Sequence, residues 1–387
     1  MNVTTDPIHT LLSAAAVRER AHEMLGLAME GGVDGWRVDP SRLDIAAELT
    51  AQATREAYPT LDIPFHARWR HFIAGAPRLP AAGSERARAA FDLVILSVLL
   101  DAGAGPGWRY LDAETGRSFT RSEGLAVASQ RMVEAGELDD LAGLETPALA
   151  RGFQVSGDNP LAGLEGRAAL LRRLGAQVAA RPDLFRGGRP GGLYDTLAAS
   201  AEKGALPAPA ILELLLEALG PIWADRLAID GVALGDCWRH PAIRRGDATD
   251  GLVPLHKLSQ WLAYSLIEPL EEAAIRVSEI DGLTGLAEYR NGGLFIDTGV
   301  LALTDPAAAA ATYHVSDPLI VAWRSMTVAL LDLLAPKVRA LLGVGEDDFP
   351  LARMLEGGSW AAGRRIAAER RPGGGPPLNI ISDGTVF

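Results

Sequence analysis

The chain has 387 residues, with 37 lysines and arginines against 49 aspartates and glutamates, so its formal net charge is −12. This acidic balance argues against nucleic acid and anionic membranes as partners. The single cysteine, Cys237, excludes an internal disulfide and a cysteine-based zinc site, and it fits a reducing compartment.

Helical periodicity dominates the chain from its start. The pairs Asp6-Pro7 and Asp39-Pro40 each combine an N-cap residue with a proline at the first helical position. They predict helices that end near residues 27 and 57. Ser84 is expected to cap a third helix, whose apolar residues between 91 and 99 follow the spacing of one buried face. Further helices are expected over residues 122–135, 166–180, 208–219, 256–277, 318–342 and 358–370.

Strand signals are few. Residues 108–116 predict a small hairpin in which Gly116 supplies the positive φ, and residues 227–234 and 378–381 are short candidates. Because strands and helices do not alternate, a doubly wound sheet is not expected. The sequence therefore predicts a mostly α-helical protein with a few short strands, in one domain over residues 1–387. The candidate for a boundary inside it is the glycine-rich stretch near 182–192.

The N-terminal residues lack the charged-then-apolar order of a signal peptide. The most apolar stretch, residues 91–100, contains Asp92 and is much shorter than the roughly 20 residues that span a bilayer. We therefore expect a cytoplasmic protein.

Standard phosphate-binding, nucleophile-elbow and metal-ligand motifs are absent from the sequence, so we expect no metal and no cofactor. The glycine-rich residues 103–107 precede Trp108 rather than open a helix, which favours a bent connector over a phosphate-binding loop.

Polar residues crowd into apolar contexts at several places. Residues 64–72 hold two histidines, two arginines and a tryptophan, which suit an anion and a planar group; the alternative is an amphipathic surface helix with Trp69 buried. Residues 121–124 open an apolar helix, where main-chain N–H groups attract anions, although Ser122 also fits an ordinary N-cap.

Two later stretches carry further candidates. His256, Gln260 and Tyr264 share one helix face, which fits either a pocket wall or a satisfied core network. The densest stretch, residues 279–293, mixes three carboxylates with four glycines that let the backbone bend close to a ligand. The apolar end of the chain, residues 382–387, is expected to be docked, with Phe387 buried.

Seven motifs, in order over nearly the whole chain, resemble one family. They are HxRWRHF, LLDAGAGPGWRY, RSEGLAVAS, FQVSxxNPLxGLEGR, HKLSQWLxYSLIEP, LTGLxEYRNGGL and the terminal SDGTVF. The family is fungal and bacterial, is implicated in uracil catabolism, and is known as a domain of unknown function and as uracil-catabolism protein four. The resemblance implies a role in breaking down uracil through a ribosylated intermediate.

A second resemblance is to the queuosine-nucleotide N-glycosylase (queuosine salvage) family, which has an all-helical fold related to DNA glycosylases. Residues 286–290 resemble its F-A-D-Y-R stretch with Glu for Asp, and residues 122–129 resemble its G-Y-x-S-L-x-A-A helix. An acidic residue shortly upstream of F-A-D-Y-R is a catalytic candidate there. By position it falls on Glu279 or, with a small shift, on Asp281.

Joined, the two resemblances predict a DNA-glycosylase-like N-glycoside hydrolase that releases urea from ribosylurea or its 5′-phosphate. A carboxylate beneath the sugar stabilises an oxocarbenium-like state and activates water. The catalytic candidates are Glu288, Asp281 and Glu279. The substrate-binding candidates are His66, Arg68, Trp69, Arg70, Asp101, Arg121, Ser122, Glu123, His256, Lys257, Gln260, Tyr264, Tyr289, Arg290, Asn291, Arg324 and Trp360.

The number of cationic candidates, among them Arg290 and Arg324, favours the phosphorylated substrate. Alternatively, these arginines pair with carboxylates such as Glu288, Glu123 and Asp101 to tie helices together. The rival function is a non-enzymatic pathway component that binds a nucleotide or scaffolds other enzymes. The expected partner is a small ribosylated molecule, and the oligomeric state is left open.

Overall fold

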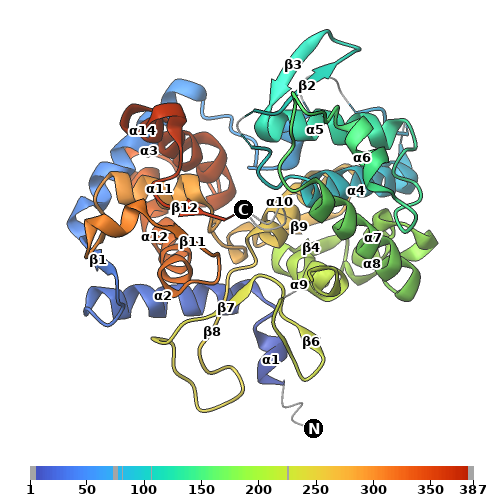
Figure 1. Cartoon of the computed structure of the whole chain (residues 1–387). Coiled ribbons are helices and arrows are strands. Elements are labelled where there is room, and N and C mark those ends of the chain that lie inside the picture. Colours follow the sequence, from blue (N-terminus) through green and yellow to red (C-terminus); the bar gives the residue numbers. More distant parts are fainter. Residues whose placement is uncertain (1–5, 73–76, 81, 106, 225, 382–387) are drawn as a thin grey trace. The chain divides into compact units, whose positions relative to one another are not determined.

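The computed structural model describes residues 6–72, 77–80, 82–105, 107–224 and 226–381. Helices dominate this part of the chain, as expected, and the strands are short (Figure 1). The chain divides into two compact units, each assembled from separate segments. Among the described residues, unit 1 comprises those within Met1–His66, Arg226–Gln260 and Glu279–Ile381, and unit 2 comprises those within Ala67–Asp225 and Trp261–Ser278. Residues 182–192 lie inside unit 2, and the expected single domain stays a prediction.

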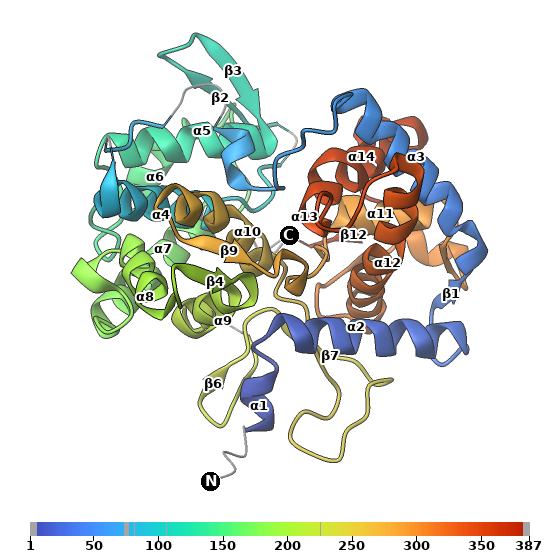
Figure 2. The ribbon, with the colours of Figure 1, turned by 180° about the vertical axis from the view of Figure 1, so that it is seen from behind.

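Unit 1 is built on its helices, which are best followed in Figure 2. They are α1 (Pro7–Thr10), α2 (Ala14–Met29), α3 (Leu43–Ala57), α11 (Tyr289–Asp297), α12 (Pro318–Leu342), α13 (Leu351–Met354) and α14 (Trp360–Arg370). A π-helical turn, Leu355–Ser359, joins α13 to α14. The strands are β1 (Trp36–Val38), β5 (Ala228–Ile229), β6 (Val232–Ala233), β7 (Cys237–Arg239), β8 (Leu252–Pro254), β10 (Leu301–Leu303), β11 (Thr312–Tyr313) and β12 (Asn379–Ile380).

Helix α12 is the core of unit 1, and α2, α3 and α11 pack against it. It starts after Asp317 with Pro318 at its first position and ends at Gly343, whose φ of 72° terminates the helix. By length and composition it could cross a membrane, but 78% of its most apolar window is buried inside the protein. This burial is that of the core helix of a globular protein.

Unit 2 contains α4 (Gly83–Leu99), α5 (Arg121–Glu134), α6 (Thr146–Gly152), α7 (Leu164–Ala180), α8 (Leu193–Ser200) and α9 (Ala208–Leu219). Its strands are β2 (Arg109–Asp112), β3 (Arg117–Thr120), β4 (Ala205–Pro207) and β9 (Arg276–Ser278). The expected hairpin is present: β2 pairs antiparallel with β3, and Gly116 in its turn has a φ of 67°. The boundary between the units falls within α10 (Lys257–Glu272), after Gln260.

The described strands form six separate two-stranded sheets. Two pairs are parallel, β4 with β9 and β11 with β12, and the others are antiparallel. Residue Trp36 of β1 lies opposite Leu303 of β10, and Cys237 of β7 lies opposite Pro254 of β8. The described residues therefore contain no doubly wound sheet, in agreement with the expectation.

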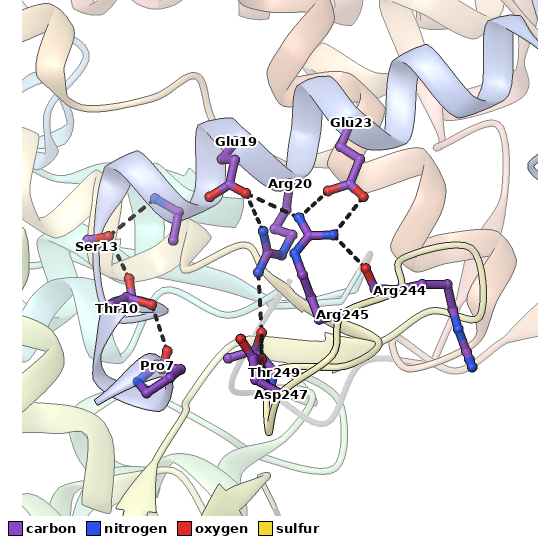
Figure 3. A network of polar contacts seen from close by, with 11 residues as sticks. Pro7, Thr10, Ser13, Glu19, Arg20, Glu23, Arg244, Arg245, Asp247 and Thr249 are labelled. Carbon is purple, nitrogen blue, oxygen red and sulfur yellow. Dashed lines mark hydrogen bonds and ion pairs between the residues drawn. The ribbon is translucent and has the colours of Figure 1, made fainter. Parts of the chain in front are cut away.

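The first expected helix is broken, so one continuous helix to residue 27 is wrong. The Thr10 hydroxyl donates to the Pro7 carbonyl oxygen at 2.6 Å, and the Ser13 hydroxyl donates to that of Thr10 at 2.8 Å (Figure 3). Ser13 also accepts a hydrogen bond from the Ala16 N–H and so caps α2. These hydroxyls compete locally with the helical hydrogen bonds, which periodicity alone does not reveal.

Figure 3 also shows how the segment between β7 and β8 is attached to α2. The Arg245 guanidinium pairs with Glu23 at 2.5 Å and with Glu19 at 3.1 Å. Arg20, from the same helix, donates to the Thr249 hydroxyl at 3.4 Å. This loop is therefore held by side chains rather than by a sheet.

Three further boundaries differ from expectation. Helix α4 begins at Gly83 and has no side-chain cap, so Ser84 lies inside the helix instead of capping it. Helix α10 ends at Glu272 because Ala274 adopts a left-handed φ of 64°. The expected burial of Phe387 concerns a residue outside the described part of the chain.

Candidate functional site

Glu288 is the buried carboxylate of the dense stretch. It caps α11: Oε2 accepts the Arg290 N–H at 2.7 Å, and Oε1 accepts the Asn291 N–H at 2.5 Å. Burial raises the pKa of Glu288, while these two N–H groups and the positive charges of Lys257 and His66 oppose the rise. A carboxylate has about four acceptor positions, so two remain for water or a ligand.

His66 is oriented by a second carboxylate. Its Nδ1 lies 2.7 Å from Oε2 of Glu356, and its ring lies 6.4 Å from the indole of Trp360. Ser359, on the same π-helical turn as Glu356, donates from its hydroxyl to Oδ1 of Asn291 at 2.8 Å. We call Glu288, His66, Lys257 and Glu356 the Glu288 cluster; all four belong to unit 1.

Asp236 and Arg324 form a largely buried ion pair in unit 1. Asp236 binds Arg324 through two hydrogen bonds of 2.8 Å each, and its carboxylate also accepts the Lys257 N–H at 3.0 Å. The Arg324 guanidinium holds the pKa of Asp236 well below its usual range. Arg324 further donates to the carbonyl oxygen of Ala287, next to Glu288, at 3.2 Å. This pair therefore fixes the start of α10 and the entry to α11.

His256 and Gln260, before and within the first turn of α10, make hydrogen bonds inside unit 1. Nε2 of His256 lies 2.8 Å from the carbonyl oxygen of Leu11, which can only accept, so Nε2 carries the proton. Burial lowers the pKa of His256. Gln260 donates to the Thr284 hydroxyl at 2.7 Å. For Gln260 the structure favours the core network over the pocket wall, whereas Nδ1 of His256 is buried without a hydrogen-bond partner among the described residues.

The other two catalytic candidates have different surroundings. Asp281 pairs with Arg339 at 2.6 Å and accepts the Leu351 N–H at 2.6 Å, so its oxygens tie three segments together. Glu279 is exposed and has a left-handed φ of 53°. Neither shares the burial of Glu288.

Arg290 and Tyr289 follow Glu288 but are held by the end of the chain. The Arg290 guanidinium donates to the carbonyl oxygen of Gly374 at 2.6 Å and lies 4.7 Å from the centre of the Tyr289 ring. Of the two arginines expected to help hold a phosphate, Arg324 is thus neutralised by Asp236, whereas Arg290 meets a neutral carbonyl oxygen.

Unit 2 contains a second buried polar group, the Arg68 cluster of Arg68, Asp101, Ser97 and Ser122. Arg68 is fully buried and lies 3.1 Å from the Asp101 carboxylate. Its guanidinium also donates to the hydroxyls of Ser97 at 2.7 Å and Ser122 at 3.1 Å. These contacts support the interpretation in which arginines tie helices together.

Two expectations about unit 2 are wrong. Residues Arg68–His71 form a short 3₁₀ turn rather than a surface helix, and Arg68 is its buried residue; Trp69 is half-buried, with its indole N–H on the Ser265 carbonyl oxygen at 2.8 Å. Ser122 is not an N-cap: α5 is preceded by Thr120, and the Ser122 hydroxyl donates to Asp101 at 2.7 Å.

The remaining candidates of unit 2 are placed as follows. Arg70 pairs with Glu268, Arg121 is exposed, Glu123 is half-buried in the first turn of α5, and Tyr264 is buried in α10. At the start of the glycine-rich stretch, the carbonyl oxygens of Ala102 and Gly103 accept hydrogen bonds from the buried guanidinium of Arg167. Among the described residues, no group of three or more His, Cys, Asp or Glu side chains could hold a metal ion.

Comparison with known proteins identifies the family. The profile described as "Protein of unknown function (DUF1688)" matches residues 10–387. The chain belongs to this family. It is 39% identical to Protein urg3 of Schizosaccharomyces pombe over 416 residues, covering 100% of both chains. It is 36% identical to Uracil catabolism protein 4 of Lachancea kluyveri over 440 residues, covering 99% of both. The family resemblance read from the motifs is thus confirmed.

Sequence reasoning missed two residues of unit 1 that orient neighbours of Glu288. Asp236 binds Arg324, and Glu356 binds His66. Asp236 stands alone between Gly235 and Cys237, and a lone carboxylate in an otherwise apolar stretch was its available signal. Glu356 precedes two glycines, and its signal was its position just ahead of the predicted helix that contains Trp360. Neither residue lies within the dense motifs.

Proposed function

We propose that this protein is an N-glycoside hydrolase of uracil catabolism that cleaves ribosylurea, or its 5′-phosphate, to urea and ribose or ribose phosphate. The observation that carries the proposal is the buried Glu288 carboxylate, fixed by two main-chain N–H groups beside the charges of Lys257 and His66. A role in uracil catabolism is supported by the relative named Uracil catabolism protein 4, which matches over its full length.

The proposed reaction exchanges one bond at the anomeric carbon. Water attacks this carbon, its C–N bond to urea breaks, and positive charge develops on the sugar in between. The Glu288 carboxylate stabilises that charge and accepts a proton from the attacking water. The urea nitrogen gains a proton as it leaves, so the products are free urea and the sugar.

The pairing of the arginines bears on the choice of substrate. Arg324 is neutralised by Asp236, and Arg290 is bound to the Gly374 carbonyl oxygen. A 5′-phosphate would need a cation that is not already paired. The carbonyl group of Gly374 is neutral and leaves the charge of Arg290 unmatched, so ribosylurea and its 5′-phosphate both stay candidate substrates.

Two further parts of the proposal rest on the resemblances read from the motifs. We propose a fold related to DNA glycosylases, since the resemblance to the queuosine-salvage family covers the segment that contains Glu288. We also propose a cytoplasmic location, because the single cysteine fits a reducing compartment.

A direct urea assay tests the proposal. The full-length protein is incubated with ribosylurea and, separately, with its 5′-phosphate, without added metal or nucleotide, and released urea is measured over time. We expect urea from at least one of the two substrates, and the comparison shows which of them the protein prefers. If neither substrate yields urea while calorimetry detects binding, the hydrolase proposal fails and the binding or scaffold function replaces it.

A further inference from the structure

The π-helical turn between α13 and α14 packs closely against α3 and Ile63. A Cβ on Gly358 would lie 2.6 Å from both Cγ2 of Thr50 and Oγ1 of Thr54, and one on Gly357 would lie 3.0 Å from Cδ1 of Ile63. At position 358 a side chain would require a shift of the turn or of α3, and at position 357 Ile63 would have to move slightly, so the turn packs closely against α3 and the segment that follows it. π-helical turns inside helices often occur at functional sites, and this one fixes the direction of Glu356.

Glu356 uses this position to hold His66 and Tyr58. Oε2 lies 2.7 Å from Nδ1 of His66, and Oε1 accepts from the Tyr58 hydroxyl at 3.3 Å. The His66 N–H donates to the Ala352 carbonyl oxygen at 3.1 Å, so both the main chain and the ring of His66 are anchored to the α13 region. The ionised Glu356 carboxylate can only accept, so Nδ1 of His66 carries a proton.

A short chain of contacts links this pair to Glu288. Ser359, three residues after Glu356, donates to Oδ1 of Asn291 at 2.8 Å, and the Asn291 N–H donates to Glu288 at 2.5 Å. Both His66 and Glu288 are 8% exposed, so each is largely buried but keeps a small accessible surface. Hydrogen bonds thereby connect both His66 and Glu288 to the π-helical turn Leu355–Ser359.

We propose that His66 is the general acid that protonates the departing urea and that Glu356 is the positioning residue that holds His66 for this step. The inference rests on the proposed hydrolase function and adds roles that this function leaves open. As the C–N bond breaks, the proton on Nε2 of the imidazolium passes to the urea nitrogen. Glu288 takes a proton from water, whose oxygen bonds to the anomeric carbon. Proton exchange with solvent then restores both groups.

The need for an acid follows from the leaving group. Urea is a poor anionic leaving group, so the C–N bond breaks readily only if the nitrogen receives a proton in the transition state. A riboside whose leaving group departs as a stable anion does not have this need. Loss of a general acid should therefore slow the release of urea much more than the release of a stable anion. Loss of a residue that only supports the fold should slow both reactions equally.

The test compares ribosylurea with 4-nitrophenyl β-D-ribofuranoside in the full-length protein and in the variants His66→Gln and Glu356→Gln. Gln at position 356 keeps an acceptor oxygen for Nδ1 and removes the charge. We expect kcat for urea release to fall by roughly 10²- to 10⁴-fold in His66→Gln, and by at least tenfold in Glu356→Gln. Release of 4-nitrophenolate should stay within about threefold of the parent.

The ratio of the two rates does not depend on the fraction of variant that is folded, so partial unfolding cannot imitate the result. Glu369→Gln, an exposed glutamate on α14, is the matched control and should leave both rates unchanged. The inference is overturned if either variant lowers kcat for urea release by less than threefold, or if both substrates lose rate equally. A parent that releases urea from neither ribosylurea nor its 5′-phosphate refutes the hydrolase function itself, which is a separate outcome.

Discussion

The Glu288 cluster and the Arg68 cluster are both buried groups of charges, yet their hydrogen bonds differ in kind. Arg68 is bonded to a carboxylate and two hydroxyls, and its charge is matched by Asp101. Glu288 is bonded to two main-chain N–H groups, and burial raises its pKa. A satisfied ion pair stabilises a fold, whereas a fixed carboxylate with acceptor positions to spare can act on a ligand.

The largest stability effect separates the two clusters. Arg68→Met removes the guanidinium that neutralises the mostly buried Asp101 carboxylate, which should lower the free energy of unfolding by about 3–5 kcal/mol. The half-buried Arg70–Glu268 pair is the matched control, and Arg70→Met should cost no more than about 1 kcal/mol. Denaturant unfolding measures both. An Arg68→Met protein that keeps its stability but loses urea release would make the Arg68 cluster part of the site.

An intermediate effect is expected at the π-helical turn. The Cβ of Gly358→Ala would meet Thr50 and Thr54, each at 2.6 Å, and overpacking of this kind costs about 1–3 kcal/mol. The turn must shift to accommodate it, so Glu356 moves and urea release should fall more than tenfold in the folded protein. Thermal unfolding and the urea assay measure the two effects. Full activity in a destabilised variant would show that the position of Glu356 does not matter.

The smallest expected effect is a pH dependence of the free energy of unfolding, caused by the Glu288 carboxyl group. Its pKa in the folded protein is raised above the ordinary value of 4.5. Above pH 4.5 the unfolded chain has lost a proton that the folded protein still holds. The contribution to stability is therefore present below that pH and is lost as the pH rises through the raised pKa. The parent should lose stability relative to Glu288→Gln over this window, as measured by denaturant unfolding between pH 4 and 8. A difference that is constant with pH would contradict the assignment.

The sequence revealed the regular helices well, because periodicity and proline caps are local signals. Helices α9 and α12 occupy the expected residues. The break before Ser13 was missed because it depends on two hydroxyl groups that turn back onto the main chain. The π-helical turn was missed because its glycines are required by close contacts with α3, and α3 lies roughly 300 residues earlier in the sequence.

The candidate site was predictable in part for the same reason. The dense stretch pointed to Glu288, but its three carboxylates could be ranked only when Asp281 was found bonded to Arg339 and Glu279 was found exposed. Asp236 and Glu356 lie far in sequence from the residues they orient, so their roles depend on the folded contacts. The sequence could therefore predict the residues of the dense stretch, but not the distant residues Asp236 and Glu356.

The most direct test of the central claim is urea release from ribosylurea by Glu288→Gln, measured beside Glu279→Gln. Losing a catalytic carboxylate should lower kcat/KM by roughly a thousandfold or more, while the weakened cap of α11 costs no more than about 2 kcal/mol of stability. Glu279→Gln makes the same chemical change on an exposed residue, so activity and stability should match the parent, the latter within about 0.5 kcal/mol. A Glu288→Gln protein that releases urea at the parent's rate would contradict the account.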